Sequence, residues 1–300
     1  MRPLVAVRIL TYNHERYIAQ ALASVLEQVT NFEYKIVIGE DCSTDNTKNI
    51  CVEYAKKYPD KIILLCNAKN DIKKNSRDNF EECKKTGAKY IALLEGDDYW
   101  TDPFKLQKQV DLLEANSSLS ICFHRAIERH EGSPGERIIP DGPMNAILGF
   151  ADLLEGSNFI PTLSCVFKNF DVPLPSWFYQ LYFADYGLHL INAKRGDIGF
   201  IDEVMGVYRI NQSSIHGKLT STNEGLAKAY VQHVQFWEVI KQTNEFNNKL
   251  VSAAQEKAIK NVEYYRMKVR QSKSPYLFKL WAELRKILSM CKRSLSSLFK

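Results

Sequence analysis

Residues 90–98 read Tyr-Ile-Ala-Leu-Leu-Glu-Gly-Asp-Asp, and they indicate the class of this 300-residue chain more clearly than any other segment. The first five residues are apolar, as in a strand buried within a sheet, so the carboxylates that follow emerge together at the sheet's edge. Three carboxylates within four residues repel one another unless a positive group neutralises them. A divalent metal ion is the simplest such group.

A second strand-like run also ends in acid, because residues 35–38 are followed directly by Gly39-Glu40-Asp41. A metal ion next to a second acidic loop indicates a charged substrate that carries phosphate. Together, the two segments favour an enzyme that acts on a nucleotide sugar.

The first 115 residues alternate strand and helix patterns, including a short helix predicted at 79–86. Repeated β-α-β units imply a mostly parallel sheet with helices on both sides. The predicted strands of this sheet lie at 4–10, 35–38, 62–65 and 90–94.

Polar residues follow these strands directly. Asn13 and Asp102 are suited to cap the helices that follow the first and fourth strands. Ligands bind beyond the carboxyl ends of such strands, so we expect Asn13, Asp41, Asp97 and Asp98 to gather at one edge of the sheet.

The rest of the chain is less regular. Between residues 116 and 160, Gly and Pro cluster at 132–135 and 141–143, which predicts loops and lids. A helix is predicted from Asp185 to Arg195, and the pattern is helical from about Asn223 to the end. Further strand patterns occur at 162–167, 198–201 and 204–210.

Composition excludes several classes of protein. The apolar fraction of 45% and charged fraction of 25% are those of an ordinary globular protein. The seven cysteines have no C-x-x-C spacing, so we expect no disulfide framework or zinc site and a cytoplasmic location. The N-terminal run is too short for a signal peptide, and no stretch reaches the ~18 apolar residues of a membrane span.

The net charge of +5 is concentrated near the C-terminus. Residues 266–300 contain ten Lys or Arg and one acid, or +9, which leaves −4 for residues 1–265. A nucleic-acid partner would require a basic face on the folded domain, so we expect none.

Three segments resemble the signature motifs of glycosyltransferase family 2, in the order and spacing of that family: Thr11-Tyr12-Asn13, residues 40–47 (EDCSTDNT) and residues 95–103 (EGDDYWTDP). The resemblance covers roughly residues 1–215. It implies an inverting, metal-dependent enzyme with the GT-A fold, in which a Rossmann-like, mostly parallel sheet has flanking helices. A helical C-terminal extension would follow.

By this resemblance, residues 1–115 form the nucleotide-sugar-binding half and 116–218 the acceptor-binding half of one GT-A domain, with 219–300 as the helical extension. The segment Thr11-Tyr12-Asn13 and Asp41 would hold the nucleotide base, with Glu40 beside them. A carboxylate at the mouth of a sheet can accept a proton from a base edge on physical grounds too. The alternative is that Asp41 caps the following helix.

The resemblance places Glu95, Asp97 and Asp98 at the D-x-D motif of the family. Mn²⁺ or Mg²⁺ prefers oxygen ligands, so Asp97 and Asp98 would bind the metal together with diphosphate oxygens. Glu95 stands where many relatives have Asp, and it would accept from ribose or contact the metal. The alternative is an acidic surface turn that caps the next helix.

Inversion requires a base on the acceptor side. Residues 183–188 (FADYGL) match the segment that supplies it in the family, so Asp185 is the candidate catalytic base. Ala184 replaces the acid that usually precedes this Asp. A helix N-cap is the competing explanation for Asp185.

Other family positions point to groups that would bind diphosphate or metal. Arg209, within Val207-Tyr208-Arg209, would serve the diphosphate or form a structural ion pair, and Arg77 is a comparable candidate. Asn211 stands where relatives often have a metal-approaching histidine, which leaves His216 as a weak replacement.

Residues 275–300 predict a basic amphipathic helix with apolar side chains on one stripe. Such a helix fits peripheral attachment to the inner, anionic face of a membrane. It equally fits docking on the enzyme's own body or on a partner subunit in a homodimer, and the sequence leaves these alternatives open.

The leading hypothesis is transfer of one sugar from a nucleotide sugar, UDP-activated by preference, to a hydroxyl of a glycan or lipid-linked acceptor in cell-surface polysaccharide assembly. The Q-x-x-R-W motif of processive polymerases is absent. A nucleotidyltransferase is an alternative, although residues 11–15 are not its glycine-rich basic loop. A non-catalytic scaffold that binds partners through the helical tail is the other, left open by Ala184 and Asn211.

Overall fold

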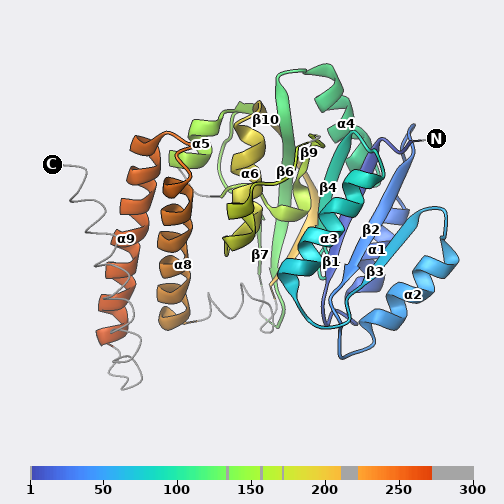
Figure 1. The fold of residues 1–300 in the computed structure, drawn as a ribbon, viewed down its shortest axis with the longest axis horizontal. Helices are drawn as coiled ribbons and strands as arrows, with labels where there is room; N and C mark the ends of the chain where they lie inside the picture. The colour runs from blue at the N-terminus through green and yellow to red at the C-terminus, as the bar shows by residue number, and fades with distance from the viewer. Residues whose placement is uncertain (1, 133–134, 156–157, 171, 211–221, 272–300) are drawn as a thin grey trace. The chain divides into compact units, whose positions relative to one another are not determined.

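A computed structural model describes residues 2–132, 135–155, 158–170, 172–210 and 222–271 (Figure 1). The chain forms two compact units. The first contains residues 1–153, 157–175 and 185–209, and the second contains residues 154–156, 176–184 and 210–300. The boundaries of 1–115, 116–218 and 219–300 expected from the sequence stay a prediction.

Four parallel strands form one half of the central sheet, as predicted. Their order is β3-β2-β1-β4, and their side chains are mostly buried, as expected for strands covered on both faces. Thr11 of β1 is level with Glu40 of β2, and Leu10 is level with Glu95 of β4. The strand ends that carry the acidic loops therefore lie side by side. The strands are β1 (Val5–Thr11), β2 (Tyr34–Glu40), β3 (Ile62–Cys66) and β4 (Tyr90–Glu95).

The other half of the sheet is built from antiparallel pairs and continues the order from β4 as β9-β6-β10-β5, with β7 paired to β6 and β8 to β10. The strands are β5 (Tyr99–Trp100), β6 (Leu119–His130), β7 (Glu136–Ile139), β8 (Ile147–Leu148), β9 (Val166–Lys168) and β10 (Asp197–Ile210).

This half corrects three predictions. The segment 116–160, expected to form loops, contains the long strand β6. This strand was not recognised because its buried residues include the polar Ser120 and His124, which interrupt the apolar pattern. The two strands expected at 198–201 and 204–210 are one continuous strand, β10. The strand expected at 162–167 begins as the 3₁₀ helix η1 (Thr162–Ser164) before β9.

Helices cover both faces of the parallel half. Apolar side chains of α1 (Ile18–Leu26), α2 (Thr47–Lys57) and α4 (Lys105–Ala115) share a core with Val7 and Ile9 of β1. On the other face, α3 (Ile72–Lys85) contacts β1 and β2. The remaining helices of this unit are α5 (Phe150–Glu155), whose end passes into the second unit, and α6 (Ala184–Ala193).

Helix α3 is longer than the predicted helix at 79–86. It begins after Asp71, whose side chain accepts the Lys74 N–H at 3.1 Å. Its buried face carries Asn75 and Asn79, and the Asn79 amide donates to two strand carbonyls of β1 and β2, at 3.3 and 3.0 Å. Because these buried residues are polar, apolar periodicity cannot reveal the first turns.

Two predicted caps are wrong. Helix α1 begins after Tyr17, and Asn13 instead lies in the preceding loop with φ at 55°. Helix α4 begins after Phe104, so Asp102 lies one turn earlier, where its side chain accepts the Phe104 N–H at 2.7 Å. In both loops, a turn intervenes between the polar residue and the helix.

The core behind α4 contains a buried lysine. The Lys105 Nζ lies 3.8 Å from the centre of the Trp100 ring and has no hydrogen-bond partner among the described residues. Burial lowers the pKa of Lys105 to about 7. The indole N–H of Trp100 donates to the Leu163 carbonyl at 2.8 Å, which fixes the ring beneath the ammonium group.

The second unit is helical, as predicted for the C-terminal extension. Helices α8 (Asn223–Gln242) and α9 (Asn248–Gln271) form an antiparallel hairpin (Figure 1), and η2 (Ser176–Gln180) belongs to the same unit. Tyr230 stacks on Tyr265 with centroids 5.2 Å apart. No helix among the described residues is long and apolar enough to span a membrane, and the basic tail of 275–300 lies outside those residues.

Candidate active site

The loops after β1 and β2 are joined to each other at the carboxyl edge of the sheet. The Asn13 side-chain oxygen accepts the Thr44 N–H at 2.8 Å, and the Asn13 N–H donates to the Ser43 hydroxyl at 3.0 Å. The His14 N–H donates to the Thr47 hydroxyl at 2.7 Å. Asn13 therefore links the two loops. It does so in the left-handed backbone conformation, which asparagine tolerates better than most residues.

The turn after β4 lies against the loop after β1. A Cβ atom at Gly96 would lie 2.6 Å from the Thr11 hydroxyl oxygen and 2.9 Å from the His14 ring. Only glycine fits such an approach. The structure therefore brings the three predicted loops together, and Thr11 is buried among them while Tyr12 is exposed.

Asp98 is fully buried, and only one of its carboxylate oxygens has a partner among the described residues. Its Oδ1 accepts the Arg209 backbone N–H at 2.8 Å, and its Oδ2 has no partner among the described residues. Burial, and then the charge of Asp97, raises the pKa of Asp98 well above its usual range. Asp97 is partly exposed, with its Oδ2 3.7 Å from the His14 Nε2.

Glu95 has a pKa raised to about 8, chiefly by burial. Asp97 and Asp185 raise this pKa further, while Arg8 of β1 lowers it. Arg8 is buried and donates to the Ser76 hydroxyl at 2.7 Å. Arg8 was not predicted from the sequence, although a charged residue within an apolar strand is itself a signal of a buried partner.

Arg209 holds the acidic turn through the backbone. Its guanidinium donates to the Asp97 carbonyl at 2.6 Å and to the Gln20 side chain. Its guanidinium carbon lies 4.4 Å from the centre of the Tyr99 ring and 5.2 Å from that of Tyr17. Buried in this way, Arg209 orders the turn that carries Asp97 and Asp98.

Asp41 is buried and held by the segment between β3 and α3. Its carboxylate accepts from the side chains of Asn67 and Asn70, at 2.6 and 3.0 Å, and from the Asp71 N–H at 2.9 Å. Asp45 instead accepts the Thr47 N–H at the start of α2, at 3.0 Å. The interpretation of Asp41 as the cap of α2 is therefore wrong.

Glu40 lies beside Asp41 and is also buried. Its Oε1 accepts the Ser43 N–H at 2.6 Å, whereas its Oε2 has no hydrogen-bond partner within the part of the chain that the structure describes. The two neighbouring acids thus differ, since both oxygens of Asp41 are engaged and one oxygen of Glu40 is not.

Asp185 lies in the first turn of α6, and its Oδ2 accepts from Asn158 at 2.9 Å and from the Thr162 hydroxyl at 3.4 Å. The pKa of Tyr208 is raised chiefly by burial, then by the charges of Asp98 and Asp97, and to a smaller extent by the charge of Asp185. Asp185 therefore shares an electrostatic environment with the acid cluster. No backbone N–H of α6 donates to its carboxylate in the described structure, so nothing supports the N-cap alternative.

Arg77 and His216 are the remaining predicted residues. Arg77 lies on the exposed face of α3, inside the helix. His216 and Asn211 lie outside the described residues.

A divalent metal fits the carboxylates that are present. Among the described residues no group donates to the buried Asp98 Oδ2, burial and the charge of the adjoining Asp97 raise the pKa of Asp98, and Asp97 itself is partly exposed. No group of three His, Cys, Asp or Glu side chains forms a closed metal site among the described residues. Two carboxylates with substrate oxygens and water are the usual open site of Mg²⁺ or Mn²⁺.

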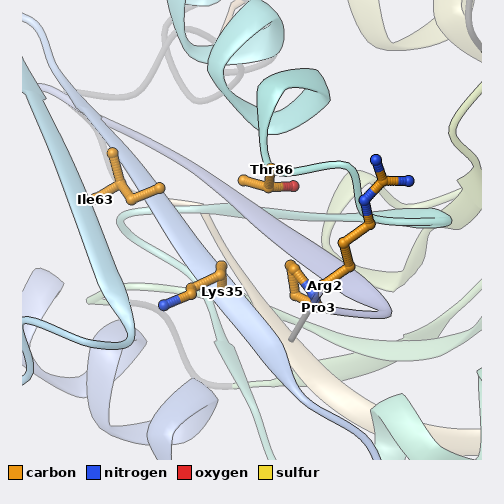
Figure 2. A pocket seen from close by; sticks show the side chains of 5 residues that line it. All are labelled: Arg2, Pro3, Lys35, Ile63 and Thr86. Atoms are coloured by element: carbon orange, nitrogen blue, oxygen red, sulfur yellow. The ribbon is translucent and has the colours of Figure 1, made fainter.

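A separate pocket lies at the opposite end of the parallel strands. Its volume is about 550 Å³, and Figure 2 shows its lining near the amino ends of β1, β2 and β3. It contains none of the predicted site residues. The lining residues are Arg2, Pro3, Lys35, Ile63 and Thr86.

The family model of glycosyl transferase family 2 matches residues 6–170, which include all three acidic and polar loops. The chain belongs to this family. An uncharacterized protein of Mycobacterium tuberculosis is 33% identical over 234 residues, or 76% of this chain, and the chain spans 62% of the length of that relative.

Two other relatives carry functional names. An uncharacterized glycosyltransferase of Nostoc is 26% identical over 95% of this chain and 88% of its own length. TuaG of Bacillus subtilis, whose name places it in teichuronic acid biosynthesis, is 29% identical over 46% of this chain and 53% of its own length.

Solved structures show the same fold as this member of family 2. TarS of S. aureus in complex with UDP has a TM-score of 0.52 at 14% identity, covering 90% of this chain and 92% of that one. A mannosyltransferase of Pyrobaculum calidifontis in complex with GDP-Man and Mn²⁺ has a TM-score of 0.58 at 14% identity, covering 94% and 79%. The GT-A fold predicted from the sequence is confirmed.

Proposed function

We propose that the protein is an inverting, metal-dependent glycosyltransferase that moves one sugar from a UDP-activated donor to a hydroxyl of a glycan or lipid-linked acceptor. The observation that carries the proposal is the buried Asp98 Oδ2, which has no hydrogen-bond partner among the described residues and lies within an acid cluster that shares its electrostatic environment with Asp185. Such an arrangement provides a cation site for a diphosphate and a separate carboxylate base.

On the donor side, Asp97 and Asp98 would hold the metal, which would supply positive charge to the leaving diphosphate. Arg209 orders the turn that carries both carboxylates. Glu95 would accept from the ribose, and Asp41, held by asparagines, would offer a fixed carboxylate to the base.

On the acceptor side, Asp185 would take the proton from the attacking hydroxyl as the new bond forms at the sugar carbon. Direct displacement by that hydroxyl inverts the configuration at this carbon.

The choice of substrate is supported by similarity. The solved neighbours are described with UDP, with UDP-GlcNAc, and with GDP-Man and Mn²⁺. TuaG is named for teichuronic acid biosynthesis, which favours a role in cell-surface polysaccharide assembly. We also propose that the enzyme acts at the cytoplasmic face of a membrane, to which the basic tail of residues 275–300 would attach.

Calorimetry with UDP, in the presence and absence of Mn²⁺, tests the donor site. We expect metal to strengthen UDP binding to the parent protein and Asp98→Asn to weaken the metal-dependent binding more than about tenfold, because the charge of a ligand is lost. Asp111→Asn, the same change at an exposed position of α4, should bind like the parent.

Two outcomes would overturn the proposal. Binding of UDP without any metal coupling would favour a non-catalytic scaffold. Release of pyrophosphate from a nucleoside triphosphate and a sugar phosphate, with no transfer from a panel of nucleotide sugars, would favour a nucleotidyltransferase.

A further inference from the structure

The carboxylate of Asp185 is tethered through one oxygen. Its Oδ2 accepts from Asn158 and Thr162, at 2.9 and 3.4 Å, while no described residue donates to its Oδ1. Two donors on one oxygen fix the plane of the carboxylate. Oδ1 is then the oxygen that remains to accept a proton.

Asn158 connects Asp185 to a buried histidine. The Asn158 amide nitrogen donates to Asp185, so its Oδ1 is an acceptor, and that oxygen lies 2.9 Å from the His189 Nδ1. The proton of His189 must therefore be on Nδ1. The Nε2 of His189 is buried and has no hydrogen-bond partner among the described residues.

His189 is electrically neutral in this position. Burial lowers the pKa of His189 to about 4, although the charge of Asp185 acts in the other direction. Asp185 and His189 stand four residues apart on α6, and Asn158 bridges them from the segment after α5. The bridge orients the carboxylate without placing a positive charge beside it.

We propose that Asn158 and His189 are positioning residues that hold Asp185 with its Oδ1 free to accept the proton of the acceptor hydroxyl. This inference rests on the proposed function, in which Asp185 is the base. A protonated histidine in direct contact would stabilise the charged carboxylate and make it a weaker base. The neutral asparagine bridge avoids this loss.

Other titratable groups also face Asp185. Electrostatic interactions connect it to Glu95 on β4, to Cys165 before β9, to Tyr208 on β10, and to Tyr186 and His189 on α6. Of these groups, only Glu95, with a pKa of about 8, becomes negatively charged within the pH range over which a rate profile is measured. A change that is confined to Asn158 therefore isolates the bridge.

Asn158→Asp in the full chain tests the bridge through pH. A second carboxylate replaces the donor at 2.9 Å, so the pair shares a proton and the acid limb of the kcat/KM profile for sugar transfer should move up by about 1–3 pH units. Asn49→Asp, which adds the same charge on the exposed face of α2, should leave the profile unchanged. An unmoved acid limb in Asn158→Asp overturns the proposal.

Two variants of His189 test the bridge through its donor. His189→Gln keeps an N–H that can reach Asn158 and should retain most of kcat, whereas His189→Leu removes it and should lower kcat by about 10- to 100-fold with the donor KM unchanged. Thermal melts establish that both variants fold. Equal kcat values for the two folded variants would refute a role for the N–H of His189.

The failure of this inference is distinguishable from that of the proposed function. A parent protein that transfers no sugar and shows no metal-coupled UDP binding refutes both. Transfer by the parent with full activity in Asp185→Asn refutes the base and its positioning residues, while the glycosyltransferase activity stands.

Discussion

Replacing Lys105 by methionine should stabilise the protein, and more so at neutral than at alkaline pH. The side chain is fully buried, and its ammonium group contacts the Trp100 ring without accepting or donating any hydrogen bond among the described residues. Methionine has a similar length and carries no charge, so it can fill the same space.

The magnitude follows from the shift in pKa. The folded pKa of about 7 lies below the ordinary 10.5, so the unfolded chain binds more protons than the folded one between these values, and the stability of the parent rises with pH there. The buried charge costs about 4 kcal/mol at pH 7 and about 2 kcal/mol at pH 9.

Urea unfolding of the parent and Lys105→Met at pH 7 and pH 9, with reductant present, measures the effect. We expect the variant to be more stable by about 4 kcal/mol at pH 7 and by about 2 kcal/mol at pH 9. Lys108→Met, at a half-exposed ion pair of the same helix, should show no such gain. A stability gap that does not change with pH would refute the reasoning.

Two further predictions concern buried polar side chains. Arg209→Ala should lower the free energy of unfolding by about 3 kcal/mol, because buried acceptors lose a charged donor, whereas Arg129→Ala at an exposed ion pair should cost less than about 1 kcal/mol. Urea curves that show equal losses would contradict this. Asn79→Ala should cost about 2 kcal/mol, since two strand carbonyls lose their side-chain donor, while exposed Asn49→Ala should stay within about 0.5 kcal/mol. The same unfolding assay checks both, and a neutral Asn79→Ala would show that water replaces the amide.

The parallel half of the sheet could be predicted because its strands are short apolar runs separated by helices. Each of the four predicted strands is present within one or two residues of its expected position. The antiparallel half was predicted less well. Strand β6 has buried polar side chains on its inward face, and only the neighbouring strands reveal that this face is covered.

The residues of the candidate site likewise fall into those that the sequence predicts and those that it does not. The acids at the ends of β2 and β4 follow directly from local sequence, since a strand that ends at the sheet's edge delivers the next residues to that edge. The contacts of Asp41 with Asn67 and Asn70 have no local signal, because an asparagine in a loop is an ordinary residue. The same holds for Asn158.

Local sequence is enough to predict which strands end in carboxylates, and hence that these carboxylates share an edge of the sheet. Only the folded chain reveals which of them are buried, which oxygens have partners, and that Asp185 lies within the field of Glu95. The difference arises from distance along the chain. Periodicity reports only on neighbours in sequence, whereas burial and pKa depend on side chains from segments that meet only after folding.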